Sequence, residues 1–279
     1  MRARIFFSLG LLFLVCIVFA VLMLPQETQD VETHTVSAID AQTIKRIEVS
    51  RKRSKDLVFE KNNGHWTIVS PLLARANPDR IDSILGIVSS SSHTRINTGE
   101  EKLVTFGLEP AQITVNLNQY EFKFGHTDPI DERRYLYFDG LIHLIDDGLF
   151  HQLRQMPEFF VSTRLVPNEE TIAAMRIKGR LLEKRGNNWL LTPALAGVDS
   201  DKLAVLVDNW KQARARRILP YTEGNKAQRI RLSFSSGRET IYELVSQTPA
   251  FILGRSDLGL QYLFEAEIAP LLLPEEDTD

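Results

Sequence analysis

The sequence predicts an α+β protein: a duplicated unit of antiparallel hairpins plus one amphipathic helix, preceded by a single transmembrane helix. The main observation is a stretch, Phe59 to Pro71, that recurs as Leu182 to Pro193. Both copies contain an apolar residue, Glu-Lys, a polar turn, Trp, an apolar run and Pro. A polar turn between two apolar runs is typical of a β-hairpin, so the same hairpin is expected twice. We expect Trp66 and Trp189 to be buried between the sheet and the helix that follows.

A helix is predicted after each Trp hairpin. Asn77 is a good N-cap and Pro78 suits the first helical position, which predicts a helix from about Pro78 to Ser91. Asp199 caps the counterpart, which we expect from about Ser200 to Arg214. Apolar residues recur at helical spacing in both segments: Ile81, Ile84, Leu85 and Val88 in the first, and Leu203, Leu206, Val207 and Trp210 in the second.

Further strands are predicted where alternating or apolar runs are separated by turn residues. The strongest turn signal is Asp139-Gly140, a frequent two-residue hairpin loop. The predicted strands are residues 44–49, 113–117, 120–124, 135–138 and 141–145 in the first copy, and 175–178, 230–234, 240–245, 251–253 and 261–264 in the second. Short closing helices are expected at residues 147–154 and 266–272.

These signals divide the chain into six parts. They are a cytoplasmic stub and transmembrane anchor (1–24), a tether (25–43), a first α+β repeat (44–156), a connection (157–171), a second α+β repeat (172–273) and an acidic tail (274–279). The tether is rich in Gln, Thr, Glu and Asp and has no clear helical or strand period.

The N-terminus predicts an uncleaved membrane anchor. Residues Ile5 to Leu24 form an apolar run, and about twenty helical residues reach roughly 30 Å, the thickness of the hydrocarbon core. The apolar side chains favour insertion by on the order of 5 to 9 kcal/mol. A cleaved signal peptide is the alternative, but its apolar core is usually about 7 to 15 residues long. Met23-Leu24-Pro25 is also a poor cleavage site, and a lipid-modified Cys16 would lie in the middle of the run.

The charges beside this run predict its orientation. Arg2 and Arg4 precede it, whereas the first basic residue after it is Lys45. The positive-inside rule then keeps the N-terminus cytoplasmic and the body on the far side of the membrane. In a Gram-negative bacterium the protein would be a single-pass inner-membrane protein with a periplasmic body.

The composition argues against nucleic-acid binding and against cysteine-based sites. The formal charge is −3, or −5 without Arg2 and Arg4, and a mildly acidic body does not favour nucleic-acid binding, which needs a basic face. Cys16 is the only cysteine, so one chain can form neither a disulfide framework nor a multi-cysteine metal site.

No catalytic motif is found, and the sequence names no cofactor. His143, Asp146, Asp147 and His151 are ligand-type residues close together, but their spacing matches no established metal motif. A strand end in which Asp146 or Asp147 caps the next helix is the alternative. Adjacent carboxylates at Glu169-Glu170 lack the apolar context that raises a carboxyl pKa.

Two basic segments are candidate contact sites. Arg214, Arg216 and Arg217 follow the second helix, where cations complement the helix C-terminus, and they are the predicted partner-binding residues. The segment from Arg51 to Lys55 contains four basic residues. It is interpreted as a solvated hairpin tip, with contact to an anionic lipid or glycan as the alternative.

Several features resemble the bacterial family catalogued as domain of unknown function 4340. They are the N-terminal anchor, the hairpin ending in Trp66, the helix start Asn77-Pro78-Asp79, and the segment Phe106-Gly107-Leu108-Glu109-Pro110 before a hairpin. The resemblance covers roughly residues 44–273, although the second copy lacks the Phe-Gly-Leu-x-Pro element. It implies an envelope protein, in some members associated with ABC-type transport or gliding motility, and it defines no catalytic residue.

The expected function is therefore a membrane-anchored accessory or scaffolding protein of an envelope complex, with ABC transporter subunits as possible partners. A periplasmic glycan- or small-ligand-binding module is the alternative, and it predicts a concave face lined by exposed aromatics such as Tyr135, Tyr137 or Phe159. A hydrolytic function would need a convergent acid-base or metal cluster, for which His143 and His151 are the nearest residues.

Overall fold

A computed structural model describes residues 34–52, 54–223 and 228–274. The chain divides into two compact units, Met1–Thr33 and His34–Asp279, and the described residues belong to the second. The predicted anchor and residues 275–279 of the predicted tail lie outside the described residues. Within the described ranges, no helix is both long and apolar enough to cross a membrane.

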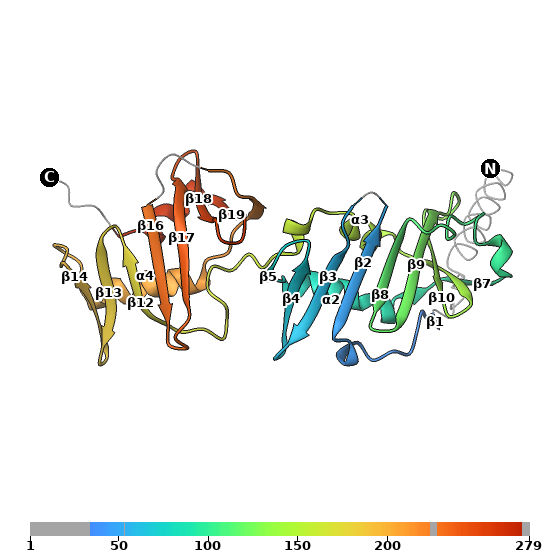
Figure 1. Ribbon diagram of the computed structural model, residues 1–279, viewed down its shortest axis with the longest axis horizontal. Helices are drawn as coiled ribbons and strands as arrows, with labels where there is room; N and C mark the ends of the chain where they lie inside the picture. The colour runs from blue at the N-terminus through green and yellow to red at the C-terminus, as the bar shows by residue number, and fades with distance from the viewer. Residues whose placement is uncertain (1–33, 53, 224–227, 275–279) are drawn as a thin grey trace, which may run out of the picture. The chain divides into compact units, whose positions relative to one another are not determined.

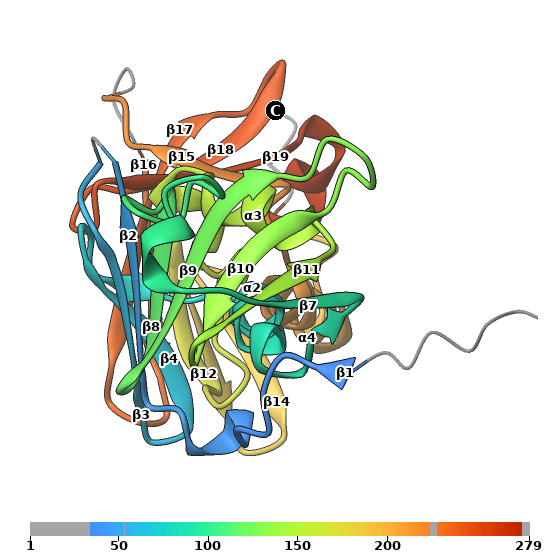
Figure 2. The same ribbon diagram turned by 90° about the vertical axis from the view of Figure 1, so that its right-hand side faces the viewer.

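The first sheet has nine strands in the order β5-β4-β3-β2-β8-β9-β10-β11-β7. Every neighbouring pair is antiparallel, and the run from β2 to β11 can be followed from left to right in Figure 2. The strands are β2 (Arg46–Arg51), β3 (Leu57–Asn62), β4 (His65–Ser70), β5 (Ala74–Arg75), β7 (Thr94–Asn97), β8 (Ile113–Leu117), β9 (Tyr120–Thr127), β10 (Arg134–Phe138) and β11 (Leu141–Ile145).

The second sheet has eight antiparallel strands in the order β14-β13-β12-β16-β17-β18-β19-β15. This order is equivalent to that of the first sheet between β4 and β7. In both sheets the strand that carries the hairpin Trp lies at one end of this order, and the strand that follows the principal helix lies at the other end. The strands are β12 (Ile172–Ile177), β13 (Arg180–Arg185), β14 (Asn188–Thr192), β15 (Arg217–Pro220), β16 (Gln228–Phe234), β17 (Glu239–Ser246), β18 (Ala250–Arg255) and β19 (Leu260–Glu265). The predicted α+β class is therefore confirmed.

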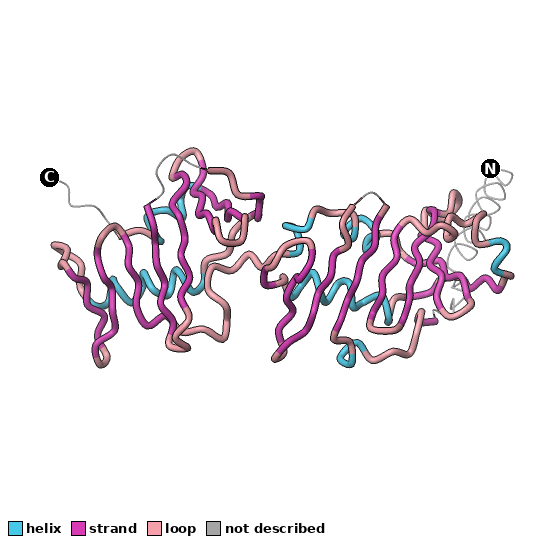
Figure 3. The backbone as a smooth tube through the Cα atoms, viewed as in Figure 1, coloured by secondary structure: helices cyan, strands magenta, loops and turns pink. Residues whose placement is uncertain are grey.

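One principal helix accompanies each sheet. In Figures 1 and 3, α2 (Pro78–Leu85) lies behind the first sheet and α4 (Ser200–Gln212) behind the second. The shorter helical segments are η1 (Ala41–Thr43), η2 (Gly86–Ser89), η3 (Glu100–Lys102), α3 (Gly148–Leu153), η4 (Pro157–Phe160), η5 (Ala266–Ile268) and α5 (Ala269–Leu272). As predicted, Asn77 caps α2 and Asp199 caps α4 with side-chain oxygens.

Both principal helices end earlier than predicted. After Leu85 the first continues as the 3₁₀ turn η2, because Gly86 and the β-branched Ile87 and Val88 are weak helix formers. The chain then enters the short strand β6 (Ser91–Ser92). The second ends at Gln212, since Ala213 is extended (φ −55°, ψ 130°). Arg214 is therefore not helical.

The two tryptophans are buried, as expected. Trp66 and Trp189 are each 9 % exposed, and α4 packs against β14, which carries Trp189. Trp210 of α4 is also buried and donates from Nε1 to the carbonyl oxygen of Leu272, at 2.8 Å. In the second half, strand and helix are thus joined by large apolar side chains, whose burial stabilises the fold.

The described part of the predicted tether packs against the first half. Strand β1 (His34–Thr35) pairs with β6, and the N–H of Val36 donates to the carbonyl oxygen of Ser90, at 2.9 Å. The side chain of Val36 is buried, as is that of Ile44. Residues 34–43 are consequently part of the folded body.

Candidate functional site

The segment that joins the two sheets, residues 157–171, is called the connector below. Its backbone hydrogen-bonds first to one half and then to the other. The N–H of Ser162 donates to the carbonyl oxygen of Arg75 in β5, at 2.8 Å. The carbonyl oxygen of the next residue, Thr163, accepts from Ala215, which lies between α4 and β15, also at 2.8 Å. The change of partner therefore falls between two neighbouring residues.

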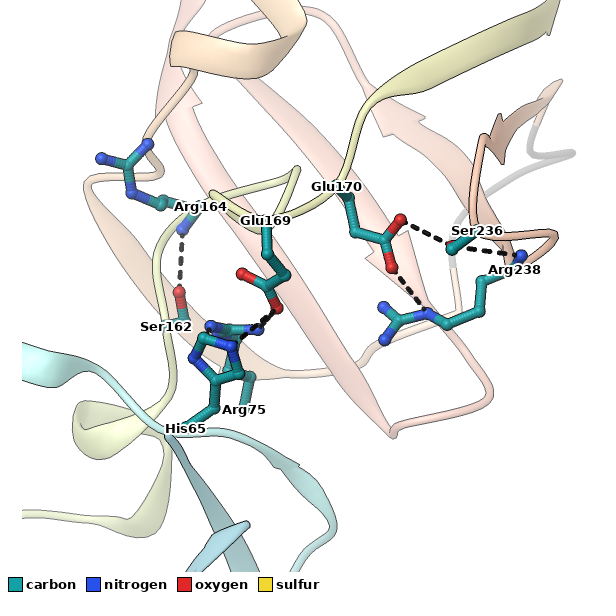
Figure 4. A network of polar contacts seen from close by, with 8 residues as sticks. All are labelled: His65, Arg75, Ser162, Arg164, Glu169, Glu170, Ser236 and Arg238. Atoms are coloured by element: carbon teal, nitrogen blue, oxygen red, sulfur yellow. Dashed lines mark hydrogen bonds and ion pairs between the residues drawn. The ribbon is translucent and has the colours of Figure 1, made fainter. Parts of the chain in front are cut away.

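Glu169 of the connector contacts the first half (Figure 4). Its Oε1 accepts a hydrogen bond from Nη1 of Arg75 and lies 3.8 Å from Nε2 of His65. Nη2 of Arg75 is 2.8 Å from Nδ1 of His65, and because an arginine can only donate, Nδ1 is the acceptor. Burial alone would raise the pKa of Glu169, but the hydrogen bond from Arg75 holds that pKa below its ordinary value.

Glu170, the next residue, contacts the second half. Its side chain is buried, Oε2 accepts from Oγ of Ser236 at 2.7 Å, and Oε1 lies 3.2 Å from Nε of Arg238. Figure 4 shows the two carboxylates pointing to opposite sides of the connector. The adjacent acids noted in the sequence therefore fasten the connector to both halves and do not form a carboxylate pair.

A cavity of about 430 Å³ adjoins the connector and is called the junction cavity below. Tyr242 and Tyr262 contribute aromatic surface to its wall. No acidic residue is among the described residues that line it, whereas five lining side chains are basic: His65, Arg75, Arg164, Arg238 and Arg255. Such a lining favours a ligand that carries carboxylate or phosphate groups.

Three of these arginines are neutralised by acids behind the wall. Arg75 pairs with Glu169 and Arg238 with Glu170, as described above. Arg255 forms a two-point contact with Asp257, in which Nε to Oδ1 is 2.9 Å and Nη2 to Oδ2 is 2.8 Å. Although burial alone would lower the pKa of Arg255, this contact raises it, so Arg255 is a fixed cation.

Arg164 and Arg214 lack such neutralisation. Their backbones pair in an isolated antiparallel bridge, and within the described residues neither guanidinium has a carboxylate partner in a hydrogen bond or ion pair. The pKa of Arg164 is lowered, first by burial and then by the positive charge of Arg214, while Asp79 opposes the shift. In Figure 4 the guanidinium of Arg164 points away from Glu169.

The three predicted partner-binding arginines therefore have different surroundings, and of the three only Arg214 was expected within the helix, which ends at Gln212. Arg214 lies beside Arg164, which lines the junction cavity. Arg216 forms an ion pair with Glu265, in which both side chains are exposed. Arg217 is exposed at the start of β15.

The metal-ligand candidates do not converge. His143 is buried and contacts Ser92, with 2.9 Å between Nδ1 and Oγ, whereas Asp146 lies 3.2 Å from His93. The carboxylate of Asp147 accepts two hydrogen bonds from the buried Arg134, at 2.6 and 2.9 Å, and His151 is 3.3 Å from the same carboxylate. No group of three or more His, Cys, Asp or Glu residues in the described ranges has a metal-holding arrangement.

The aromatic candidates for ligand binding are half-buried. Tyr135 and Tyr137 pack against a small cluster formed by Leu103, Leu108 and Ile142, and the hydroxyl of Tyr135 donates to Asp128. Phe159 packs against the main core, with the guanidinium carbon of Arg80 4.0 Å from its ring centroid. None of the three lines the junction cavity.

Sequence analysis did not find most of the residues that line the junction cavity. Arg75, Arg164, Arg238 and Arg255 are isolated in the sequence, and they come together only in the folded chain, where the connector contacts both halves. The one available signal was the pair of acids at 169–170 close to Arg164, since buried acids and arginines commonly pair.

These observations define an α+β protein of two antiparallel sheets with equivalent strand order, joined by an ion-paired connector. A family model described as Domain of unknown function (DUF4340) matches residues 66–229, more than half of the 279 residues. The chain belongs to this family, and the family resemblance in its sequence is confirmed. Searches of curated proteins and of solved structures gave no match.

Proposed function

We propose that the protein is a membrane-anchored, extracytoplasmic accessory or scaffolding protein of an envelope complex, and that it binds an acidic segment of a partner at the junction cavity. The observation that carries this proposal is Arg164 in the cavity wall, whose backbone pairs with that of Arg214 and whose pKa is lowered by burial and by the positive charge of Arg214. Two neighbouring guanidiniums repel each other unless an anion lies between them. A carboxylate that accepts from both would remove the repulsion and add charge-assisted hydrogen bonds.

The membrane part of the proposal rests on the sequence. The apolar run from Ile5 to Leu24 is long enough to span a bilayer, and Arg2 and Arg4 favour a cytoplasmic N-terminus. The inner membrane would then hold the chain, with the body in the periplasm. The equivalent strand order of the two sheets supports a duplicated body behind this anchor. An ABC-type transport system is the partner that the family resemblance suggests.

The partner contact is tested by affinity purification of the full-length chain in mild detergent, with partners identified by mass spectrometry. Arg164→Gln with Arg214→Gln removes two charges and leaves the fold contacts of the connector intact. We expect envelope-transport subunits to co-purify with the wild type and the double variant to bind roughly tenfold or more weakly. Arg185→Gln is the matched control, because Arg185 is an exposed, ion-paired arginine on β13 of the second sheet.

The outcomes are distinct. Loss of the same partner subunits in the double variant, with retention in Arg185→Gln, supports the proposal. Isolation of the wild type as a lone monomer, or equal partner recovery from all three proteins, would count against it. A chain that begins at Pro25 provides the second comparison: retention of the partner would assign the contact to the body, and loss from the membrane fraction would support the anchor.

A second candidate function is binding of a small anionic ligand in the same cavity. The observation in its favour is the volume of about 430 Å³ combined with Tyr242 and Tyr262 in the wall. Calorimetric titration with dicarboxylates and acidic sugars separates the two candidates. Saturable binding that is lost in the Arg164 and Arg214 double variant, without any co-purifying protein, would favour the ligand-binding module.

A further inference from the structure

We propose that a second cavity, in the first half of the protein, binds the phosphate group of an anionic ligand. This cavity of about 580 Å³ lies at the tip of the β2–β3 hairpin, beside the end of α3, and is called the basic cleft below. Four basic side chains line it: Arg51, Lys52, His126 and Arg154. The inference requires neither the membrane anchor nor the partner of the preceding section.

The charges of the basic cleft are not neutralised within the described chain. None of its described lining residues is acidic. No described acid forms a hydrogen bond or ion pair with Arg51, Lys52 or Arg154, and the negative charge of Asp56 acts on Arg51 only from a distance. A concave surface with like charges and low-dielectric walls concentrates the electrostatic field and attracts anions.

Arg51 is held in a fixed position at the wall. Its Nη1 donates to the carbonyl oxygens of Leu153 and Gln155, at 3.4 and 2.6 Å, just beyond the body of α3. Its Nε is shielded from solvent and has no hydrogen-bond partner in the part of the chain that the structure describes. Burial lowers the pKa of Arg51, and Asp56 offsets this only in part. A bound oxyanion would supply negative charge close to this partly buried cation.

The shape and charge of the basic cleft favour phosphate over a single carboxylate. Three permanent cations exceed the charge of one carboxylate, whereas a phosphate monoester carries up to two charges and three terminal oxygens. Arg51 and Lys52 contribute positive charges and Ser54 contributes a hydroxyl group, and together these suit the several oxygens of a phosphate. The cleft, at about 580 Å³, is larger than one phosphate and leaves room for an attached organic group.

The Phe-Gly-Leu-Glu-Pro segment supports one wall of this cleft. Gly107 has a positive φ of 67°, and a Cβ at this position would overlap the ring of His126. The N–H of His126 donates to the carbonyl oxygen of Phe106 at 2.8 Å, and Pro110 itself lines the cleft. Because the second copy of the unit lacks this segment, the cleft is a feature of the first half alone.

The test is calorimetric titration of the full-length chain in phosphatidylcholine nanodiscs with glycerol phosphate. We expect one saturable site whose affinity falls as salt is raised. Lys52→Gln and Arg154→Gln should each weaken binding roughly tenfold, because each removes a charge-assisted contact. Both side chains are exposed, so these variants are expected to fold; Arg51 is left unchanged, because it also holds carbonyl groups of the backbone.

Arg185→Gln is again the matched control and should bind glycerol phosphate like the wild type. Malonate, a dianionic carboxylate, tests the preference for phosphate. Both ligands are titrated into the Arg164→Gln, Arg214→Gln double variant, so that the junction cavity does not contribute, and malonate should bind more weakly. The proposal is overturned by an absence of saturable binding at millimolar glycerol phosphate. It is equally overturned if malonate binds as tightly, or if Arg185→Gln loses as much affinity as Arg154→Gln.

The phosphate could belong to a lipid headgroup or to a soluble molecule, and a second arm distinguishes these sources. The titration is repeated in phosphatidylglycerol nanodiscs and in phosphatidylcholine nanodiscs that contain oleate at the same surface charge. Weaker binding of glycerol phosphate in phosphatidylglycerol than in oleate discs would show that the lipid occupies the cleft. Equal binding in the two discs would assign the cleft to a soluble phosphate ligand. Both results support a phosphate site.

Discussion

At the scale of single residues, His143 shows how burial changes the protonation and the role of a side chain. In the sequence it belonged to a group of possible metal ligands. In the structure it is 1 % exposed, with Nδ1 in contact with Ser92 and Nε2 without a partner among the described residues. Burial, and secondarily the charge of Arg95, lowers its pKa from 6.5 to about 4. His143 is therefore a neutral core residue at physiological pH.

This burial predicts a loss of stability in mild acid. Between pH 4 and 6.5 the unfolded chain binds a proton at His143 that the folded chain does not. The contribution of neutral His143 to the free energy of unfolding is therefore complete above pH 6.5 and is lost as the pH falls toward 4. The shift corresponds to about 3 kcal/mol. Urea unfolding at pH 7.5 and 4.5 should show a smaller acid-induced loss for His143→Asn than for the wild type. An identical loss in both proteins would contradict the argument.

A second prediction at this scale concerns Gly107. Gly107→Ala must place a methyl group in a left-handed conformation and against the ring of His126. Gly64→Ala is a matched control, since Gly64 also has a positive φ but open space around its Cβ position. Thermal or urea unfolding should show that Gly107→Ala costs about 1–3 kcal/mol more than Gly64→Ala. Adding His126→Ala should recover most of this difference, and no recovery would exclude the steric cause.

At the scale of elements, features with local causes were predictable. The Asp139-Gly140 turn has positive φ at both residues, as its residue types require, and both caps and both buried tryptophans lie where the sequence predicts them. Strands β7 and β15 were missed. Each is four residues long, and three residues of β7 and two of β15 are exposed. They form because β11 and β19, which are distant in the sequence, offer a free edge.

The cap of α4 gives a prediction at this scale. Oδ1 of Asp199 accepts from the N–H of Lys202 at 2.9 Å, which satisfies one of the unpaired donors at the start of the helix. Asp199→Ala should therefore lower the free energy of unfolding by about 1 kcal/mol, whereas Asp199→Asn, which keeps an acceptor, should cost much less. Urea unfolding of the three proteins provides the measurement. Equal losses for Ala and Asn would mean that the oxygen does not stabilise the helix.

At the scale of the whole molecule, the candidate sites were much less predictable than the fold. Arg214 was a candidate from the sequence. Arg164 becomes a candidate only in the structure, where its backbone pairs with that of Arg214. The same holds for the basic cleft, in which Arg51 meets residues about one hundred positions away, at the end of α3. Hydrophobic periodicity predicts which faces are buried, but it carries no information about which distant polar residues meet.

The last prediction concerns the connector, whose two acids bind to different halves of the protein. Glu169 pairs with the half-exposed Arg75 and contributes about 0–1 kcal/mol, whereas the buried Glu170 accepts charge-assisted bonds worth about 1.5–3 kcal/mol. Two backbone N–H groups are suitable probes. That of Ser162 donates to the first half, and that of Ser235, in the second half, donates to the carbonyl oxygen of Thr171.

Amide hydrogen exchange should separate the two attachments. Glu169→Gln should speed exchange at Ser162 by up to roughly fivefold and leave Ser235 unchanged, because only the attachment to the first half is weakened. Glu170→Gln should speed exchange at Ser235 by roughly tenfold or more, with little change at Ser162. Glu60→Gln, which breaks an exposed ion pair with Arg46 in the first sheet, is the matched control and should affect neither amide. If either connector variant accelerated both amides equally, the connector would open as one unit, and the two halves would not be fastened independently.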